Sequence, residues 1–116
     1  MNRMDELRIE RMMRLGCIAC AFLDIPCPAQ ECHHILDINR RMGDWFTIPL
    51  CRGHHQGDFT PEQKTLLQSA QLVAISSGRK LFCRIYPTER ELWELTQERL
   101  GLMWPVSTKI VPRSVA

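Results

Sequence analysis

The pattern of apolar and polar positions divides the chain into an N-terminal helix, a strand-rich centre and a helical C-terminal half. Residues 4–15 carry apolar side chains at helical spacing and are followed by Gly16, a residue typical of helix ends. Residues 35–48 combine β-branched and aromatic side chains around a Gly-Asp turn signal at 43–44, before Pro49 ends the apolar run. The centre therefore reads as a β-hairpin.

The C-terminal half carries two clear helix starts. Thr60 is a typical N-cap before a proline and predicts a helix over residues 61–70. Thr88 opens a second helix, which Gly101 is expected to end. Between them, the apolar spacing of residues 71–86 favours one helix over most of the segment, with a basic patch formed by Arg79, Lys80 and Arg84.

All four histidines stand in two adjacent pairs, at 33–34 and 54–55, near the two ends of the predicted hairpin. A hairpin brings its ends together, so the pairs are expected to lie side by side. Upstream stands a Cys-x2-Cys, and the second pair follows a cysteine as Cys-x2-His, which is the spacing of two knuckles of a tetrahedral zinc site. We assign one structural zinc to Cys17, Cys20, Cys51 and His54. His55 is not needed as a ligand of this zinc and is free to point elsewhere.

Two further cysteines, Cys27 and Cys32, form an alternative Cys-x4-Cys clip in which either could replace a knuckle ligand. Four ligands are complete without them, so we interpret both as small buried side chains. A C2H2 zinc finger is excluded, because no second histidine follows His33 at the required spacing. A zinc deaminase is excluded because it needs a His-x-Glu ahead of a Pro-Cys-x2-Cys.

Composition limits the class of protein. With 116 residues and a formal charge of +2, the chain has room for one modest core, and any affinity for nucleic acid has to come from local basic patches. We expect one domain over residues 1–101 and a tail over residues 102–116. Six cysteines without a secretory segment favour metal binding over disulfides, which places the protein in the cytoplasm.

The two histidine pairs and their cysteine resemble the ββα-metal core of zinc-stabilised HNH endonucleases. More narrowly, HHILDINRRMGDWFTIPLCRGHHQG, SGRKLF and YPTERELWE resemble the phage recombination-promoting nuclease family called Ref, over residues 17–100. The resemblance implies an α+β fold, in which a β-hairpin and a short helix at 17–57 are pinned by zinc and a helical remainder covers 61–101. It also implies a phage or prophage nuclease that cuts DNA together with RecA filaments in a bacterial cytoplasm.

The resemblance implies roles for three histidines. By position, His33 and His55 are expected to hold one divalent cation, most simply Mg²⁺ or Mn²⁺, and His34 is expected to be the general base. An imidazole exchanges protons near neutral pH, which suits that task. The basic residues near these positions match phosphate chemistry and are our candidate DNA contacts: Arg40, Arg41, Arg52, Arg79 and Lys80.

One position departs from the HNH pattern. The asparagine that orients the general base usually stands five residues before the knuckle cysteine, and here that residue is Phe46. Asp44 or Thr47 is our preferred replacement, and Asp37 and Asn39 are other polar candidates nearby. The alternative function is a non-catalytic zinc module that binds DNA or a protein partner. We favour the enzyme, because a purely structural module has no need of three further histidines.

Overall fold

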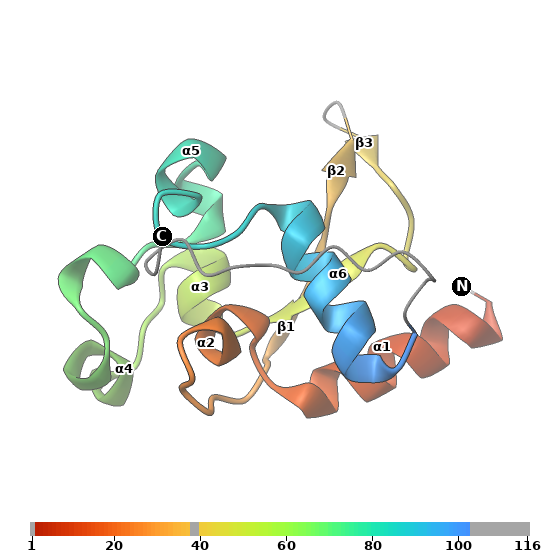
Figure 1. Ribbon diagram of the computed structural model, residues 1–116, viewed down its shortest axis with the longest axis horizontal. Helices are drawn as coiled ribbons and strands as arrows, with labels where there is room; N and C mark the ends of the chain where they lie inside the picture. The colour runs from red at the N-terminus through yellow and green to blue at the C-terminus, as the bar shows by residue number, and fades with distance from the viewer. Residues whose placement is uncertain (1, 38–39, 103–116) are drawn as a thin grey trace.

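The computed structural model describes residues 2–37 and 40–102 of a small α+β protein (Figure 1). Helices surround two short pairs of antiparallel strands, and the radius of gyration is 13.6 Å. Within the described residues, no helix combines the length and the apolar character needed to cross a membrane. The predicted tail lies outside the described residues from position 103 onward.

The centre of the fold is a hairpin, as the sequence predicts. Strand β1 (Glu31–His34) pairs antiparallel with β4 (Thr47–Leu50), and β2 (Leu36–Asp37) pairs with β3 (Arg40–Arg41) farther along the same two arms. All four residues of β4 are buried, whereas those of β1 are half-buried. The two predicted ends of the hairpin therefore meet, with α3 (Arg52–Gln56) following directly after β4.

Two details of the predicted hairpin are wrong. The chain reverses between β2 and β3, not at positions 43–44, where Gly43 has a φ of +108° and its carbonyl accepts the N–H of Phe46 at 3.1 Å. This turn bends the second arm between β3 and β4. Pro49 does not end the strand but lies opposite Cys32 within the ladder. A two-stranded sheet leaves one edge of each strand open, so a proline without an N–H is tolerated there.

Helices α1 (Arg3–Leu15) and α6 (Glu89–Leu100) pack against β4 and against each other (Figure 1). The start and the end of α6 are those that the sequence predicts. Thr88 forms a capping box with Glu91, and Gly101 takes the left-handed conformation at φ +74°. The face of α6 turned inward carries Leu92 and Trp93, both at most 2 % exposed.

The buried face of α1 differs from the predicted apolar stripe. Leu7 and Leu15 remain more than one third exposed, whereas Arg8 is 2 % exposed. Arg8 donates to the hydroxyl and carbonyl oxygens of Thr47, both at 2.9 Å, and to Gln97 Oε1 at 2.7 Å. Burial lowers the pKa of Arg8 to about 10. Arg8 therefore links α1 to β4 and α6 from the buried side of the helix.

The segment between α3 and α6 is more broken than predicted. It contains α4 (Pro61–Leu66), two 3₁₀ turns, η1 (Ser69–Gln71) and η2 (Ile75–Ser77), and α5 (Arg79–Phe82). One helix over residues 71–86 is therefore wrong. Gly78, at φ +126°, interrupts the helical path between η2 and α5. The interruption lets Phe82 and Tyr86 stack in the core, with ring centroids 4.5 Å apart.

Candidate metal centre and nuclease site

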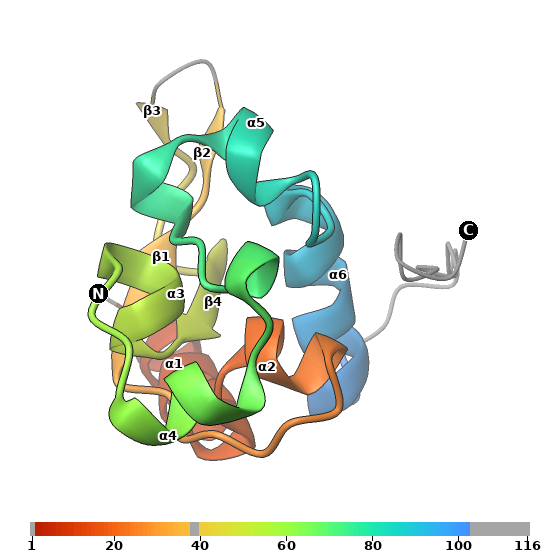
Figure 2. The same cartoon turned by 90° about the vertical axis from the view of Figure 1, so that its left-hand side faces the viewer.

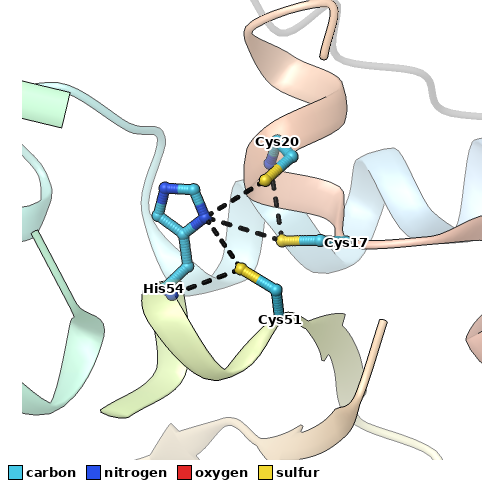
Figure 3. Close-up of side chains that lie close together, drawn as sticks. All are labelled: Cys17, Cys20, Cys51 and His54. Carbon is cyan, nitrogen blue, oxygen red and sulfur yellow. Dashed lines mark hydrogen bonds between the residues drawn. The ribbon is translucent and has the colours of Figure 1, made fainter. Parts of the chain in front are cut away.

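A buried cluster of three thiols and one imidazole joins α2 (Ile18–Phe22) to α3 (Figure 3). His54 Nδ1 lies 3.7 Å from the sulfur of Cys17, 3.4 Å from that of Cys20 and 3.3 Å from that of Cys51. All four ligand atoms lie within 4.8 Å of one another, and each residue is at most 1 % exposed. Figure 3 shows the four side chains pointing toward one common centre.

Local structure explains how the two knuckles form. Cys17 and Cys51 are the N-caps of α2 and α3, and their sulfurs accept the N–H groups of Cys20 and His54, three residues later. A Cys-x2-Cys or Cys-x2-His spacing therefore places both ligands of a knuckle on the first turn of a helix. The hairpin between the knuckles then brings the two helix starts together.

The cluster geometry fits zinc. Zn–S bonds of about 2.3 Å and a Zn–N bond of about 2.0 Å in a tetrahedron place nitrogen and sulfur roughly 3.5 Å apart. The three distances from His54 Nδ1 to sulfur, 3.3 to 3.7 Å, scatter around that value. The cluster is fully buried, which is the property of a structural site closed to substrate rather than of a catalytic one.

The electrostatics of the thiols also call for a cation. Burial raises the pKa of Cys17 to about 12, and hydrogen bonding with Cys17 raises the pKa of Cys20. The pKa of Cys51 is lowered by its hydrogen-bonding interactions with Cys17 and Cys20. Three adjacent buried sulfurs cannot all carry a negative charge without a compensating cation, and Zn²⁺ supplies that charge in sites with this donor set.

Outer contacts orient the imidazole and the thiols. His54 Nε2 lies 2.6 Å from the hydroxyl oxygen of Tyr86, whose O–H donates to the carbonyl of Gln71 at 2.6 Å. His54 Nε2 is therefore the protonated nitrogen, and Nδ1 keeps its lone pair for a metal. The amide of Gln63 donates to the sulfur of Cys51 at 3.2 Å and reaches that of Cys20 at 3.9 Å.

Neither of the two remaining cysteines near the hairpin belongs to this cluster. The Cys27 thiol is half-buried beside it and accepts from Gln63 at 3.4 Å, while its backbone carbonyl accepts the N–H of Cys17 at 2.8 Å. Gly16 permits that contact, because a Cβ there would lie 2.6 Å from the Cys27 carbonyl oxygen. Cys32 lies elsewhere, on β1, with its pKa raised by burial.

A second cluster lies on the half-buried side of the hairpin. The rings of His33 on β1 and His55 on α3 meet edge to face, with centroids 5.1 Å apart. Glu89 Oε2 lies 2.8 Å from His33 Nε2, and Glu31 Oε1 lies 2.7 Å from His55 Nδ1. The exposed fractions of these side chains run from 10 % to 25 %. The structure thus brings the two predicted cation ligands together and adds two carboxylates.

His34, the predicted general base, follows His33 on β1, and neighbouring strand residues point to opposite faces of a sheet. Its Nε2 lies 2.8 Å from Asp44 Oδ1, and the Thr47 hydroxyl donates to the Asp44 carbonyl at 3.0 Å. Phe46, at the usual asparagine position, stacks on Trp93 instead. The Asp44 side chain therefore contacts His34, and the Thr47 hydroxyl holds the Asp44 backbone in place. The Asp37 side chain and Asn39 lie outside the described part.

The five candidate DNA contacts lie on exposed positions of β3, α3 and α5: Arg40, Arg41, Arg52, Arg79 and Lys80. Figures 1 and 2 place β3 and α5 at the same end of the molecule. Arg79 has a protein partner as well, because its Nε forms an ion pair with Glu89. It is therefore joined directly to the second cluster, which the sequence pattern did not indicate.

Sequence reasoning missed both carboxylates of the second cluster. Glu31 stands two residues before His33, and the period of two along a strand places both on one face, so a signal was present. Glu89 offered none, because it is 56 residues from His33 and reads as an ordinary first-turn acid of α6. Only the packing of α6 against the hairpin reveals it.

Comparison with known proteins identifies the family of this chain. A search of curated proteins found no significant match. A sequence model of the family described as "Recombination enhancement, RecA-dependent nuclease" matches residues 4–101. The matched range contains the Cys3His cluster, all three remaining histidines and their carboxylate partners. The chain belongs to this family of recombination-enhancing, RecA-dependent nucleases.

Proposed function

We propose that the protein is a metal-dependent, HNH-type DNA endonuclease that hydrolyses phosphodiester bonds in recombination, together with a RecA-DNA filament. The observation that carries the proposal is the set of three histidines outside the zinc-type cluster, each paired with a carboxylate at 2.7 to 2.8 Å. The description of the family supports a nuclease activity and a dependence on RecA. We place its action in the cytoplasm of a bacterium that carries the phage or prophage.

In this proposal, the Cys3His cluster binds structural zinc and holds α2 against α3. His33 and His55 bind one Mg²⁺ or Mn²⁺, and their donors fit such an ion, because two imidazoles are accompanied by two carboxylates whose charges balance a divalent cation. The bound cation would stabilise the negative charge that develops on the phosphate and on the leaving 3′ oxygen.

His34 is the proposed general base. A carboxylate oxygen can only accept a hydrogen bond, so the contact with Asp44 places the His34 proton on Nε2 and leaves the lone pair on Nδ1. That nitrogen takes a proton from the attacking water as the water oxygen bonds to phosphorus and the bond between phosphorus and the 3′ oxygen breaks. Asp44 holds the ring in this tautomer, which is the orienting role that an asparagine side chain usually has in HNH enzymes.

The exposed cations on β3, α3 and α5 are the proposed phosphate contacts. Arg40 and Arg41 lie on β3 at the far part of the hairpin, Arg52 begins α3, and Lys80 adds a positive charge on α5. A guanidinium matches phosphate with two parallel N–H groups, which suits it to hold the strand on either side of the scissile bond.

The second candidate function is a zinc module that binds DNA or protein without cutting. The closed Cys3His cluster favours it, since that cluster needs no chemistry. It leaves the facing imidazoles of His33 and His55 without a role, however, and it gives no reason for a third histidine–carboxylate pair.

The test is cleavage of circular single-stranded and double-stranded DNA by the zinc-loaded protein. Reactions with Mg²⁺, Mn²⁺ or EDTA are compared with and without RecA and ATP. We expect cutting that requires the divalent cation and RecA. DNA binding without cutting under every condition would instead establish the non-catalytic module. Cleavage at the same rate with and without RecA would support the nuclease activity and contradict the role of the RecA filament.

A further inference from the structure

His33 and His55 each have one ring nitrogen already occupied by a carboxylate. Glu89 accepts from His33 Nε2 at 2.8 Å, and Glu31 accepts from His55 Nδ1 at 2.7 Å. Ionised carboxylates have no proton to give, so the bonded nitrogens carry the hydrogens. The free lone pairs are then those of His33 Nδ1 and His55 Nε2, on two rings whose centroids are 5.1 Å apart.

The position of Glu89 is fixed by its own helix. It is the first residue of α6, directly after the N-cap Thr88, and the buried residues Leu92 and Trp93 anchor the helix one turn later. Its second carboxylate oxygen forms an ion pair with Arg79 from α5. The Glu89 side chain is only 10 % exposed, so this contact is built into the packing of α5, α6 and β1.

Glu31 is fixed in a different way. It stands two residues before His33 on β1 and lies opposite Leu50 in the β1–β4 ladder. The amide of Gln56, from the last turn of α3, donates to both of its oxygens, at 2.6 and 2.7 Å. Glu31, on the strand, thus orients His55 of α3, and Glu89, on α6, orients His33 of the strand.

Isolated exposed ion pairs contribute little to stability, and such pairs have no reason to gather at one place. Here two carboxylates hold two facing imidazoles, and each carboxylate is itself held by a second donor. Histidines that bind metals usually donate their other N–H to a carboxylate, which sets the tautomer and raises the basicity of the ligating nitrogen. Two carboxylates also compensate the charge of a divalent cation.

We propose that Glu89 and Glu31 are positioning residues of the divalent-cation site. Glu89 fixes the tautomer and the ring angle of His33, Glu31 does the same for His55, and Arg79 fixes Glu89. The inference rests on the proposed function, because the cation is the one that His33 and His55 are proposed to bind.

The experiment measures Mn²⁺ affinity directly, by electron paramagnetic resonance of free Mn²⁺ titrated with zinc-loaded, full-length protein. Glu89→Gln and Glu31→Gln keep the size of the side chain and remove its charge. Glu94→Gln is the matched control, because Glu94 also lies on α6 but pairs with Arg90, on the same helix. We expect Mn²⁺ affinity to fall about 10-fold to 100-fold in the first two variants and to stay within about twofold in the control.

A second set of variants tests whether Glu89 acts on Mn²⁺ affinity by positioning His33 or only through its negative charge. In a His33→Ala background, Glu89→Gln is expected to cause no further loss of Mn²⁺ affinity, because its effect passes through His33. A full further loss there would overturn the inference, and so would equal affinities for Glu89→Gln, Glu31→Gln and Glu94→Gln. Zinc content and melting temperature are recorded for each variant, so that a change in Mn²⁺ affinity is assigned to folded protein.

The two proposals fail in different ways. Native protein that binds Mn²⁺ with the expected dependence on Glu89 and Glu31, yet never cuts DNA, contradicts the nuclease function and leaves the positioning roles standing. Native protein that cuts DNA but binds Mn²⁺ equally well in all variants contradicts the positioning roles alone. Native protein that binds no Mn²⁺ overturns the cation site itself.

Discussion

His34 Nε2, on the first arm of the hairpin, lies 2.8 Å from Asp44 Oδ1, in the turn between β3 and β4 on the second arm. The backbone of Asp44 is held in turn, because its carbonyl accepts the Thr47 hydroxyl at 3.0 Å. Thr47 is fully buried, and its hydroxyl oxygen also accepts a hydrogen bond from the guanidinium of Arg8. A continuous set of contacts therefore runs from the core of the protein to the proposed general base.

This contact predicts the effect of Asp44→Ala. Without the carboxylate, His34 loses its fixed tautomer, and we expect the cleavage rate to fall roughly 100-fold, within the range that general-base catalysis contributes. Mn²⁺ affinity should stay unchanged, because the carboxylates next to the proposed cation ligands are Glu31 and Glu89. Single-turnover cleavage and Mn²⁺ titration measure the two effects separately.

The control for Asp44 is Asp58→Ala, which removes an equal charge from an exposed position just after α3. We expect this variant to cut at the native rate. Equal rates for both variants and the native protein would show that Asp44 has no part in orienting His34.

The zinc assignment predicts opposite outcomes for two neighbouring cysteines. Cys51→Ser removes one of the clustered sulfurs, and the variant should lose zinc and unfold, because structural zinc contributes about 10 to 16 kcal/mol against a total stability of about 5 to 15. Cys27→Ser should keep one zinc per chain, since its thiol lies beside the cluster and outside it. Metal analysis and thermal melting distinguish the two.

A zinc-free but folded Cys51→Ser protein would contradict the structural role of the metal. Loss of zinc in Cys27→Ser would instead show that Cys27 is a zinc ligand, which is the alternative ligand set that the sequence alone left open.

The outer contact of His54 makes a third prediction. Tyr86→Phe keeps the ring that stacks on Phe82 but removes the hydroxyl that joins His54 Nε2 to the Gln71 carbonyl. We expect zinc affinity to fall about 10-fold to 100-fold, because the tautomer of the ligand is no longer fixed. Competition with a chromophoric chelator measures the affinity, and a value within twofold of native would refute the role of Tyr86.

Buried Arg8 predicts a large loss of stability. Arg8→Ala leaves the Thr47 carbonyl and Gln97 Oε1 without their donor, and each unsatisfied buried group costs about 1 to 3 kcal/mol. We expect the free energy of unfolding to fall by about 3 kcal/mol in urea. Arg11→Ala is the control, because Arg11 is exposed and its guanidinium donates to the Leu100 carbonyl at 3.1 Å from the surface of α1. Similar losses in both variants would contradict the role given to Arg8.

The parts of the fold that follow local chemistry were predictable from the sequence. The Cys-x2-Cys and Cys-x2-His spacings place ligands on the first turns of helices, where cysteine also caps the backbone, so the cluster could be foreseen. Thr88 and Gly101 bound α6 by capping alone. The resemblance of the histidine motif to Ref proteins agreed with the family that the chain matches.

The parts that depend on tertiary packing were not predictable. Arg8 looks like a surface cation in α1, and only the polar groups of Thr47 and Gln97 behind it make its burial favourable. Residues 71–86 keep a helical apolar spacing, but the backbone breaks at Gly78 so that Tyr86 can reach His54. Glu89 becomes part of the second cluster only when α6 packs across the hairpin.

His34 is the proposed general base of the nuclease, and the variant His34→Asn isolates this role. Asparagine can still donate an N–H to Asp44, but it cannot take a proton from water. In single-turnover cleavage of RecA-coated DNA with Mg²⁺, we expect this variant to cut at least about 100-fold more slowly, with native zinc content and native Mn²⁺ affinity. Cleavage at the native rate by a folded, zinc-loaded His34→Asn protein would show that His34 is not the general base.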